Sequence, residues 1–130
     1  MGRNKSLSPG PITWRTAAQA GRAQHQSLNG GMTRIVIAPE VFDDFDRFFD
    51  HIARFDVASA PSRIEEIIEA VQVLASSPLI GRPVRGEKRE LVIGRASRGY
   101  VALYRYIARS DTVFVLAMRS QRESGYKRDN

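Results

Sequence analysis

The sequence predicts an α+β fold in which a hairpin of two helices packs against one face of a small antiparallel sheet. Apolar side chains recur at three- and four-residue spacing over residues 40–76, which is the period of amphipathic helices. From residue 88 onward they alternate with a period of two, which is the period of strands. A short β-branched run at residues 33–38 comes first, so the predicted order is β-α-α-β-β-β.

The first predicted helix covers about residues 40–54. It follows Pro39, which ends the first strand and suits the first turn of a helix. Its apolar face comprises Val41, Phe42, Phe45, Phe48, Phe49 and Ile52. Its other face carries Asp43, Asp44, Asp46 and Asp50. No second carboxylate cluster in the sequence would face these aspartates, so we interpret them as a solvated face rather than as catalytic acids.

The second predicted helix begins near Ser59 or Ser62, either of which can cap it, and Ser62 with Glu65 fits a capping box. It is expected to end near residues 76–77, before Pro78. Its buried stripe comprises Ile64, Ile67, Ile68, Val71 and Leu74. Because the link between the two helices is short, they are expected to form an antiparallel hairpin.

Three further strands are predicted after a loop at residues 77–87 that is rich in proline, glycine and arginine. We place them at residues 88–93, 100–107 and 112–119. The connections between them are short, so they are expected to form an antiparallel meander.

The 130 residues are enough for a single folded domain. Residues 1–31 show no sustained period, so we divide the chain into a weakly ordered basic extension at 1–31 and a domain at 32–130. The absence of cysteine excludes disulfides, thiolate metal sites and cysteine nucleophiles, and the two histidines lie in different segments. We therefore expect no metal and no cofactor. Without a secretory signal or an apolar run near 20 residues, we expect a cytoplasmic protein without membrane contact.

The net charge of +6 is unevenly distributed along the chain. The extension carries four basic and no acidic residues, residues 32–80 carry four basic and nine acidic ones, and residues 81–130 carry twelve basic and five acidic ones. The domain is therefore expected to combine an acidic helical hairpin with a basic sheet. A binding surface for an anionic partner is expected on the second half.

Four segments carry a resemblance to a known family: SPLIGR at residues 77–82, KRELVIG at 88–94, YVALYRY at 100–106 and VFVLAMRSQRE at 113–123. In this order and spacing, residues 32–129 resemble the RelE/ParE superfamily of toxins from bacterial type II toxin–antitoxin pairs, which includes plasmid stabilisation proteins. The chain departs from the family pattern in its closing strand, where the usual histidine is missing.

The resemblance implies a toxin that arrests growth until a cognate antitoxin binds it. ParE-like members poison DNA gyrase and are not known to be nucleases, whereas RelE-like members enter the ribosome and cleave mRNA without a metal. Antitoxins of this class usually end in a segment that folds on binding, laying a helix into a groove and adding a strand to a sheet edge. We expect a hetero-oligomer in which the antitoxin covers the basic half.

A RelE-like activity would use strand-borne basic residues and a C-terminal tyrosine. The matching positions here are Arg119 and Tyr126, with Lys88 and Arg89 on a neighbouring strand. The family's arginine after Gly99-Tyr100 is replaced by valine, and the His-Tyr pair of another nuclease branch is missing. We favour the ParE-like activity, which makes the chain a non-enzymatic toxin, and keep a ribosome-dependent endoribonuclease as the alternative.

Four residues are candidates for binding the antitoxin or the target: Arg82, Tyr104, Arg105 and Arg122. Arg105 can equally be structural, paired with an acid such as Glu90 or with loop carbonyls. The tyrosines of residues 100–106 can stack on bases or pack in the core. Glu123 is interpreted as an ion-pair partner rather than as a general base.

Overall fold

The computed structural model describes residues 32–95 and 98–127. The predicted extension at residues 1–31 lies outside the described residues.

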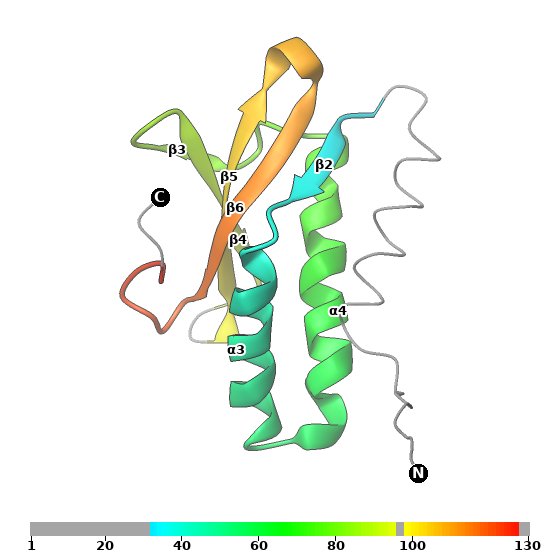
Figure 1. Ribbon diagram of the computed structural model, residues 1–130, viewed down its shortest axis with the longest axis vertical. Helices are drawn as coiled ribbons and strands as arrows, with labels where there is room; N and C mark the ends of the chain where they lie inside the picture. Colours follow the sequence, from blue (N-terminus) through cyan, green and yellow to red (C-terminus); the bar gives the residue numbers. More distant parts are fainter. Residues whose placement is uncertain (1–31, 96–97, 128–130) are drawn as a thin grey trace.

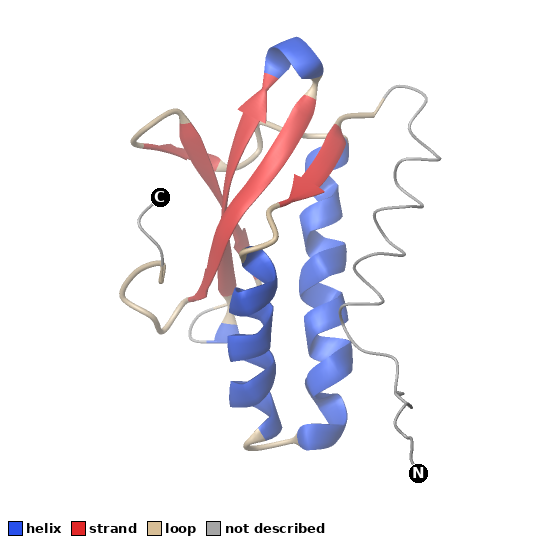
Figure 2. Cartoon of the chain, in the orientation of Figure 1, coloured by secondary structure: helices blue, strands red, loops and turns tan. Residues whose placement is uncertain are grey.

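Two helices cover one face of a five-stranded sheet, which confirms the α+β class (Figure 1). The helices are α3 (Val41–Ala53) and α4 (Ala60–Val71), and they lie side by side. The strands are β2 (Arg34–Ile37), β3 (Arg82–Val84), β4 (Lys88–Ile93), β5 (Tyr100–Ile107) and β6 (Thr112–Ser120). Short 3₁₀ turns at Val57–Ser59, Gln72–Ala75 and Ala108–Ser110 connect or extend these elements (Figure 2). Within the described ranges, no helix has the length and apolarity that crossing a bilayer requires.

The sheet is mixed rather than antiparallel, which corrects the predicted arrangement. Its strand order is β2-β6-β5-β4-β3, and β2 runs parallel to β6 from Arg34 opposite Thr112 to Ile37 opposite Val115. The local pattern predicts only that β2 is a strand. Its direction depends on the helical hairpin, which returns the chain to the far edge of the sheet and leaves β2 to pair with the last strand.

Strand β3 lies inside the segment predicted as a loop, so that prediction was wrong for Arg82–Val84. The strand pairs antiparallel with β4 across a tight turn, in which Gly86 and Glu87 have φ angles of 84° and 60°. Proline is disfavoured in strands, so the presence of Pro83 argues against a strand when only residue propensities are considered. It is tolerated because β3 is the edge of the sheet.

The core lies between the helices and the sheet. The predicted apolar stripes of both helices are confirmed, with Phe42 and Phe49 only partly buried. The predicted capping box is wrong, because α4 already begins at Ala60 with Pro61 in its first turn. Ser62 is therefore inside the helix, and its hydroxyl donates to the carbonyl of Ser59 at 3.0 Å.

A bulge separates the two halves of β6. Leu103 lies opposite Ala117 and Tyr104 lies opposite Val115, so the register skips Leu116. The simple alternation predicted for this strand is therefore wrong at its C-terminal end. After the bulge Met118 points into the core, whereas Ala117 and Arg119 lie on the face of the sheet away from the helices. We call this face the outer face.

Candidate functional site

Three side chains gather around Glu90 on the outer face, namely Arg82, Arg119 and Tyr126. We call these four residues the Glu90 cluster. Leu91 packs against the helices, and neighbouring strand residues point to opposite faces, so Glu90 points outward. The Tyr126 hydroxyl donates to Glu90 Oε2 at 2.7 Å. Arg82 donates to Glu90 Oε1 from Nε at 3.0 Å and from Nη2 at 2.8 Å.

Arg119 completes the cluster beside the tyrosine ring. Its guanidinium carbon lies 5.4 Å from the centroid of Tyr126, a cation–π distance. Its Nη1 donates to the main-chain oxygens of Ser120 at 3.4 Å and Glu123 at 3.2 Å. Arg119 therefore holds the chain that carries Tyr126 back onto the sheet.

Burial and hydrogen bonding set the charge states of the cluster. Burial first, and then the hydrogen bond to Glu90, raise the pKa of the Tyr126 phenol. Burial acts to raise the pKa of Glu90, but hydrogen bonds from Tyr126 and Arg82 outweigh it and lower that pKa. Tyr126 is thus a neutral donor and Glu90 an ionised acceptor.

Acidification is expected to reduce the free energy of unfolding of the wild-type chain more than that of a Glu90→Gln variant. The folded pKa of Glu90 lies below its ordinary value of 4.5, so the carboxylate stabilises the fold above that value. This contribution is lost as the pH falls through the lower, folded pKa. Urea unfolding at about pH 6 and at about pH 3 should show a larger loss of unfolding free energy in the wild type. Equal losses in the two proteins would contradict this assignment.

The structure separates Lys88 from Arg89. They are consecutive on β4, so Lys88 lies on the outer face with Glu90, and Arg89 lies on the opposite face. Arg89 Nη1 donates to the carbonyls of Leu79 and Gly81 at 3.0 and 2.7 Å. Arg89 therefore holds the loop that precedes β3 and is not part of the Glu90 cluster.

Arg105 and Tyr104 also form hydrogen bonds to main-chain groups, at Gly86 and Gly81 respectively. Arg105 Nη2 donates to the carbonyl of Gly86 at 3.1 Å, which confirms the loop-carbonyl alternative and not the pairing with Glu90. Tyr104 is 0% exposed, and its hydroxyl accepts the N–H of Gly81 at 2.8 Å. The structure thus places Tyr104 in the core rather than on a binding surface.

The other two tyrosines of β5 are also engaged. The ring of Tyr100 packs 4.7 Å from that of Phe48, measured between centroids. The hydroxyl of Tyr106 donates to Asp111 at 2.8 Å. Core packing, rather than a line of rings open to bases, is therefore confirmed for Tyr100 and Tyr104.

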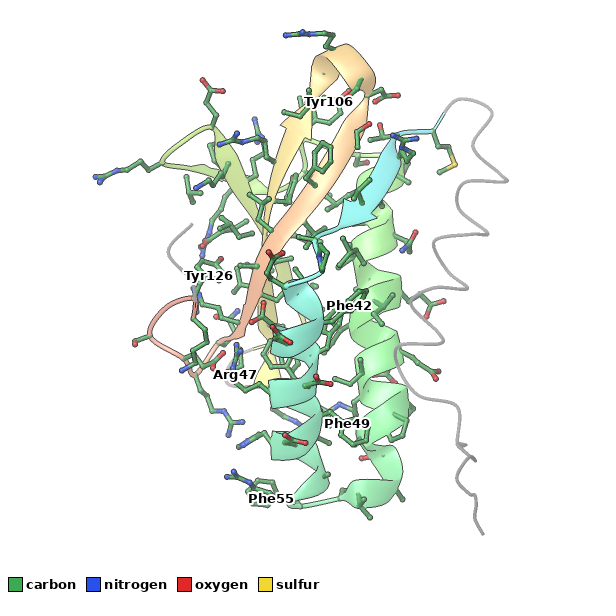
Figure 3. The ribbon with its side chains drawn as sticks, viewed as in Figure 1. Phe42, Arg47, Phe49, Phe55, Tyr106 and Tyr126 are labelled. Atoms are coloured by element: carbon green, nitrogen blue, oxygen red, sulfur yellow. The ribbon has the colours of Figure 1, made fainter. Side chains whose placement is uncertain are left out.

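A second network was missed by the sequence reasoning and joins α3 to the end of β6 (Figure 3). Arg47 donates to Asp44 at 2.9 Å and to both carboxylate oxygens of Glu123 at 2.7 and 3.1 Å. Asp44, 0% exposed, also accepts the N–H of Met118 at 2.9 Å. The solvated-face interpretation was wrong for Asp44. Its position three residues after Val41 places it in the buried stripe, which was the available signal.

Glu123 is an ion-pair partner, as predicted. Besides Arg47 it accepts the N–H of Ser120 at 2.8 Å, and burial, which opposes ionisation, is outweighed by these hydrogen bonds so that its pKa is lowered. Arg122 lies elsewhere, exposed beside His51. Across the described parts of the chain, no group of three histidine or acidic residues could hold a metal ion.

The model of one protein family, the ParE toxin of type II toxin–antitoxin systems, matches residues 35–125, more than two thirds of the chain. The chain belongs to the ParE toxin family. The match runs from β2 through both helices to the segment after β6, and it ends one residue before Tyr126. A search of curated proteins finds no match. As a ParE family toxin the chain pairs with a cognate antitoxin.

Proposed function

We propose that this ParE family toxin arrests growth in the cytoplasm by poisoning DNA gyrase, without chemistry of its own, and that its antitoxin neutralises it by covering the basic half of the domain. The observation that carries the proposal is the Glu90 cluster. Two of the residues that an RNA-cleaving toxin would need, Arg119 and Tyr126, are engaged there with main-chain carbonyls and with Glu90 rather than directed at an open site.

Cleavage of RNA requires a group that deprotonates the ribose 2′-hydroxyl and cations that stabilise the phosphorane. Tyr126 directs its proton at Glu90, and its raised pKa makes a phenolate base costly. Glu90 is ionised but is occupied by two donors. Arg119 donates to main-chain carbonyls, and Arg89 is on the other face of the sheet. This arrangement supports a surface for binding over a site for phosphoryl transfer.

The alternative keeps one observation in its favour. Arg119 and Tyr126, the pair that a RelE-like endoribonuclease would use, are adjacent on the outer face. That function would require the ribosome and mRNA to open the hydrogen bond between Tyr126 and Glu90.

The surface proposed for the antitoxin lies at the β3 edge of the outer face. Arg82 presents a side chain that is 59% exposed, although it is paired with Glu90. Exposed apolar side chains flank it, namely Leu79, Ile80 and Val92. An edge strand beside basic and apolar side chains can accept an added strand from an acidic, amphipathic segment. Arg82 is the contact with the clearest basis, because its ion pair with Glu90 can exchange for one with the partner.

Expression of the full chain without antitoxin separates the two functions. We expect growth arrest with SOS induction and DNA breaks while mRNA stays intact, and Tyr126→Phe and Arg119→Ala should retain the arrest if the protein remains folded. Prompt loss of protein synthesis with mRNA cut at codons, abolished by Tyr126→Phe, would overturn the proposal in favour of the endoribonuclease. Soluble, folded protein without any growth defect would contradict both functions.

A further inference from the structure

Three adjoining hollows surround Tyr100 at the end of the sheet nearest the tip of the helical hairpin. The middle hollow, about 290 Å³, lies between the hairpin and the segments that precede β5 and follow β6. The hollow beside Ile93, about 520 Å³, shares Arg63, Arg98 and Tyr100 with it. We call the combined depression the Tyr100 groove. It is separate from the Glu90 cluster, none of whose residues line it.

Arginines from three separate elements converge on this groove: Arg63 of α4, Arg98 of the turn before β5, and Arg122 of the segment after β6. Their fields act on the Tyr100 hydroxyl to lower its pKa, although burial is larger and leaves that pKa raised. Within residues 32–95 and 98–127, no salt bridge joins any of the three to an acidic side chain. Uncompensated guanidinium groups held close together favour an anion, and their planar donors match phosphate oxygens.

The acidic side chains around the groove do not cancel this charge. Three of them line its hollows: Asp56, Glu66 and Glu123. Glu123 is paired with Arg47 and Lys127. Asp56 and Glu66 are outnumbered by four other arginines that line the hollows, namely Arg63, Arg95, Arg98 and Arg122. Burial, with the charges of Arg122 and Arg54, lowers the pKa of His51 and keeps its ring neutral at physiological pH. The groove therefore retains its positive charge on the arginines.

An exposed aromatic side chain stands at the rim. Phe55, directly beyond α3, is 78% exposed and lines the same hollow as the three arginines (Figure 3). Its ring meets that of His51 at an interplanar angle of 67° and 5.4 Å between centroids, and its high exposure leaves much of the ring open to a ligand. A basic groove with an open aromatic face is the arrangement with which proteins bind unpaired nucleotides, because every base can stack on such a ring.

We propose that the Tyr100 groove binds a single strand of nucleic acid, with Arg63, Arg98 and Arg122 on its phosphates and Phe55 stacked on a base. A single strand is favoured over a duplex because stacking on Phe55 requires an unpaired base. It is favoured over a purely acidic peptide such as polyglutamate because carboxylates would make no use of the aromatic face. This inference goes beyond the action on gyrase and does not depend on it.

Fluorescence anisotropy of a labelled oligothymidylate with the full chain tests the proposal. The triple variant Arg63→Gln, Arg98→Gln, Arg122→Gln should bind about tenfold or more weakly, because three phosphate contacts are lost. The matched triple variant Arg34→Gln, Arg85→Gln, Arg109→Gln removes the same charge from exposed positions outside the groove and should stay within about twofold of the wild type. Residues 1–31 are present in all three proteins, so their charge does not bias the comparison.

Phe55→Ala tests the stacking role at constant charge. It should weaken binding about fivefold or more, whereas Val57→Ala, at an exposed position on the same connection, should leave binding unchanged. Equal losses in the two triple variants would overturn the proposal, as would Phe55→Ala binding like the wild type. Duplex DNA or a polyglutamate peptide that binds more tightly than the oligothymidylate, with the same sensitivity to the groove variants, would also overturn it. No gyrase is present, so failure here is distinct from failure of the proposed function.

Discussion

Replacing Asp44 with alanine is expected to lower the free energy of unfolding by about 3 kcal/mol. Its carboxylate, 0% exposed, accepts the Met118 N–H at 2.9 Å and pairs with Arg47 at 2.9 Å. Alanine leaves the N–H of Met118 without this acceptor on an edge of β6 that β2 does not reach. In this variant Arg47 still pairs with Glu123, and its side chain is partly exposed. We therefore expect a smaller loss of unfolding free energy than for breaking a fully buried ion pair.

Asp43→Ala is the matched control, because Asp43 precedes Asp44 in the first turn of α3 and is exposed. Both substitutions remove a negative charge near the helix N-terminus, so the difference between them isolates the buried contacts. Asp43→Ala should change stability by less than about 0.5 kcal/mol in urea unfolding. If Asp44→Ala were equally mild, the link between α3 and β6 would not stabilise the fold.

The second large effect is expected for Gly81→Ala, which should destabilise the chain by about 2–3 kcal/mol. A Cβ at this position would lie 2.7 Å from both the ring and the hydroxyl of Tyr104 and 2.8 Å from the carbonyl oxygen of Glu90. The strand oxygen has little freedom to move, and Tyr104 is fixed in the core, where its hydroxyl accepts the N–H of Gly81. We therefore expect the loop to be displaced from β4.

Gly125→Ala provides the control for this substitution, because a Cβ there would meet nothing within 4 Å. Thermal melting of the two variants should show a lower midpoint for Gly81→Ala and a midpoint near the wild-type value for Gly125→Ala. Equal midpoints would show that the loop yields without cost and that the contact with Tyr104 is not a constraint.

The elements that the sequence predicted well are those with a strong local period. The stripes of α3 and α4 and the strands β4 and β5 follow from which side chains recur on one face. The parallel pairing of β2 could not be read locally, because it depends on the path of the whole chain. Strand β3 is stabilised by pairing with β4 rather than by its own residues, which include Pro83.

The sequence predicted several residues of the candidate site but not how they contact one another. Arg119 and Tyr126 were expected together and are adjacent. The residue that joins them to the sheet, Glu90, was considered only as a partner for Arg105 and instead binds Arg82 and Tyr126. The faces of consecutive residues on β4 could have excluded Arg89 from the cluster, because alternation alone puts it opposite Glu90. The helical spacing from Val41 could have indicated that Asp44 is buried, but its contact with Met118 required the end of β6 to be placed beside α3, which no local pattern contains.

Incubation of the purified full chain with DNA gyrase, ATP and plasmid DNA tests the central claim most directly. If the toxin acts on gyrase without chemistry of its own, broken plasmid should accumulate only when gyrase is present, and Tyr126→Phe should act like the wild type. Unchanged gyrase activity with intact plasmid, together with cleavage of mRNA on translating ribosomes by the same preparation, would contradict it.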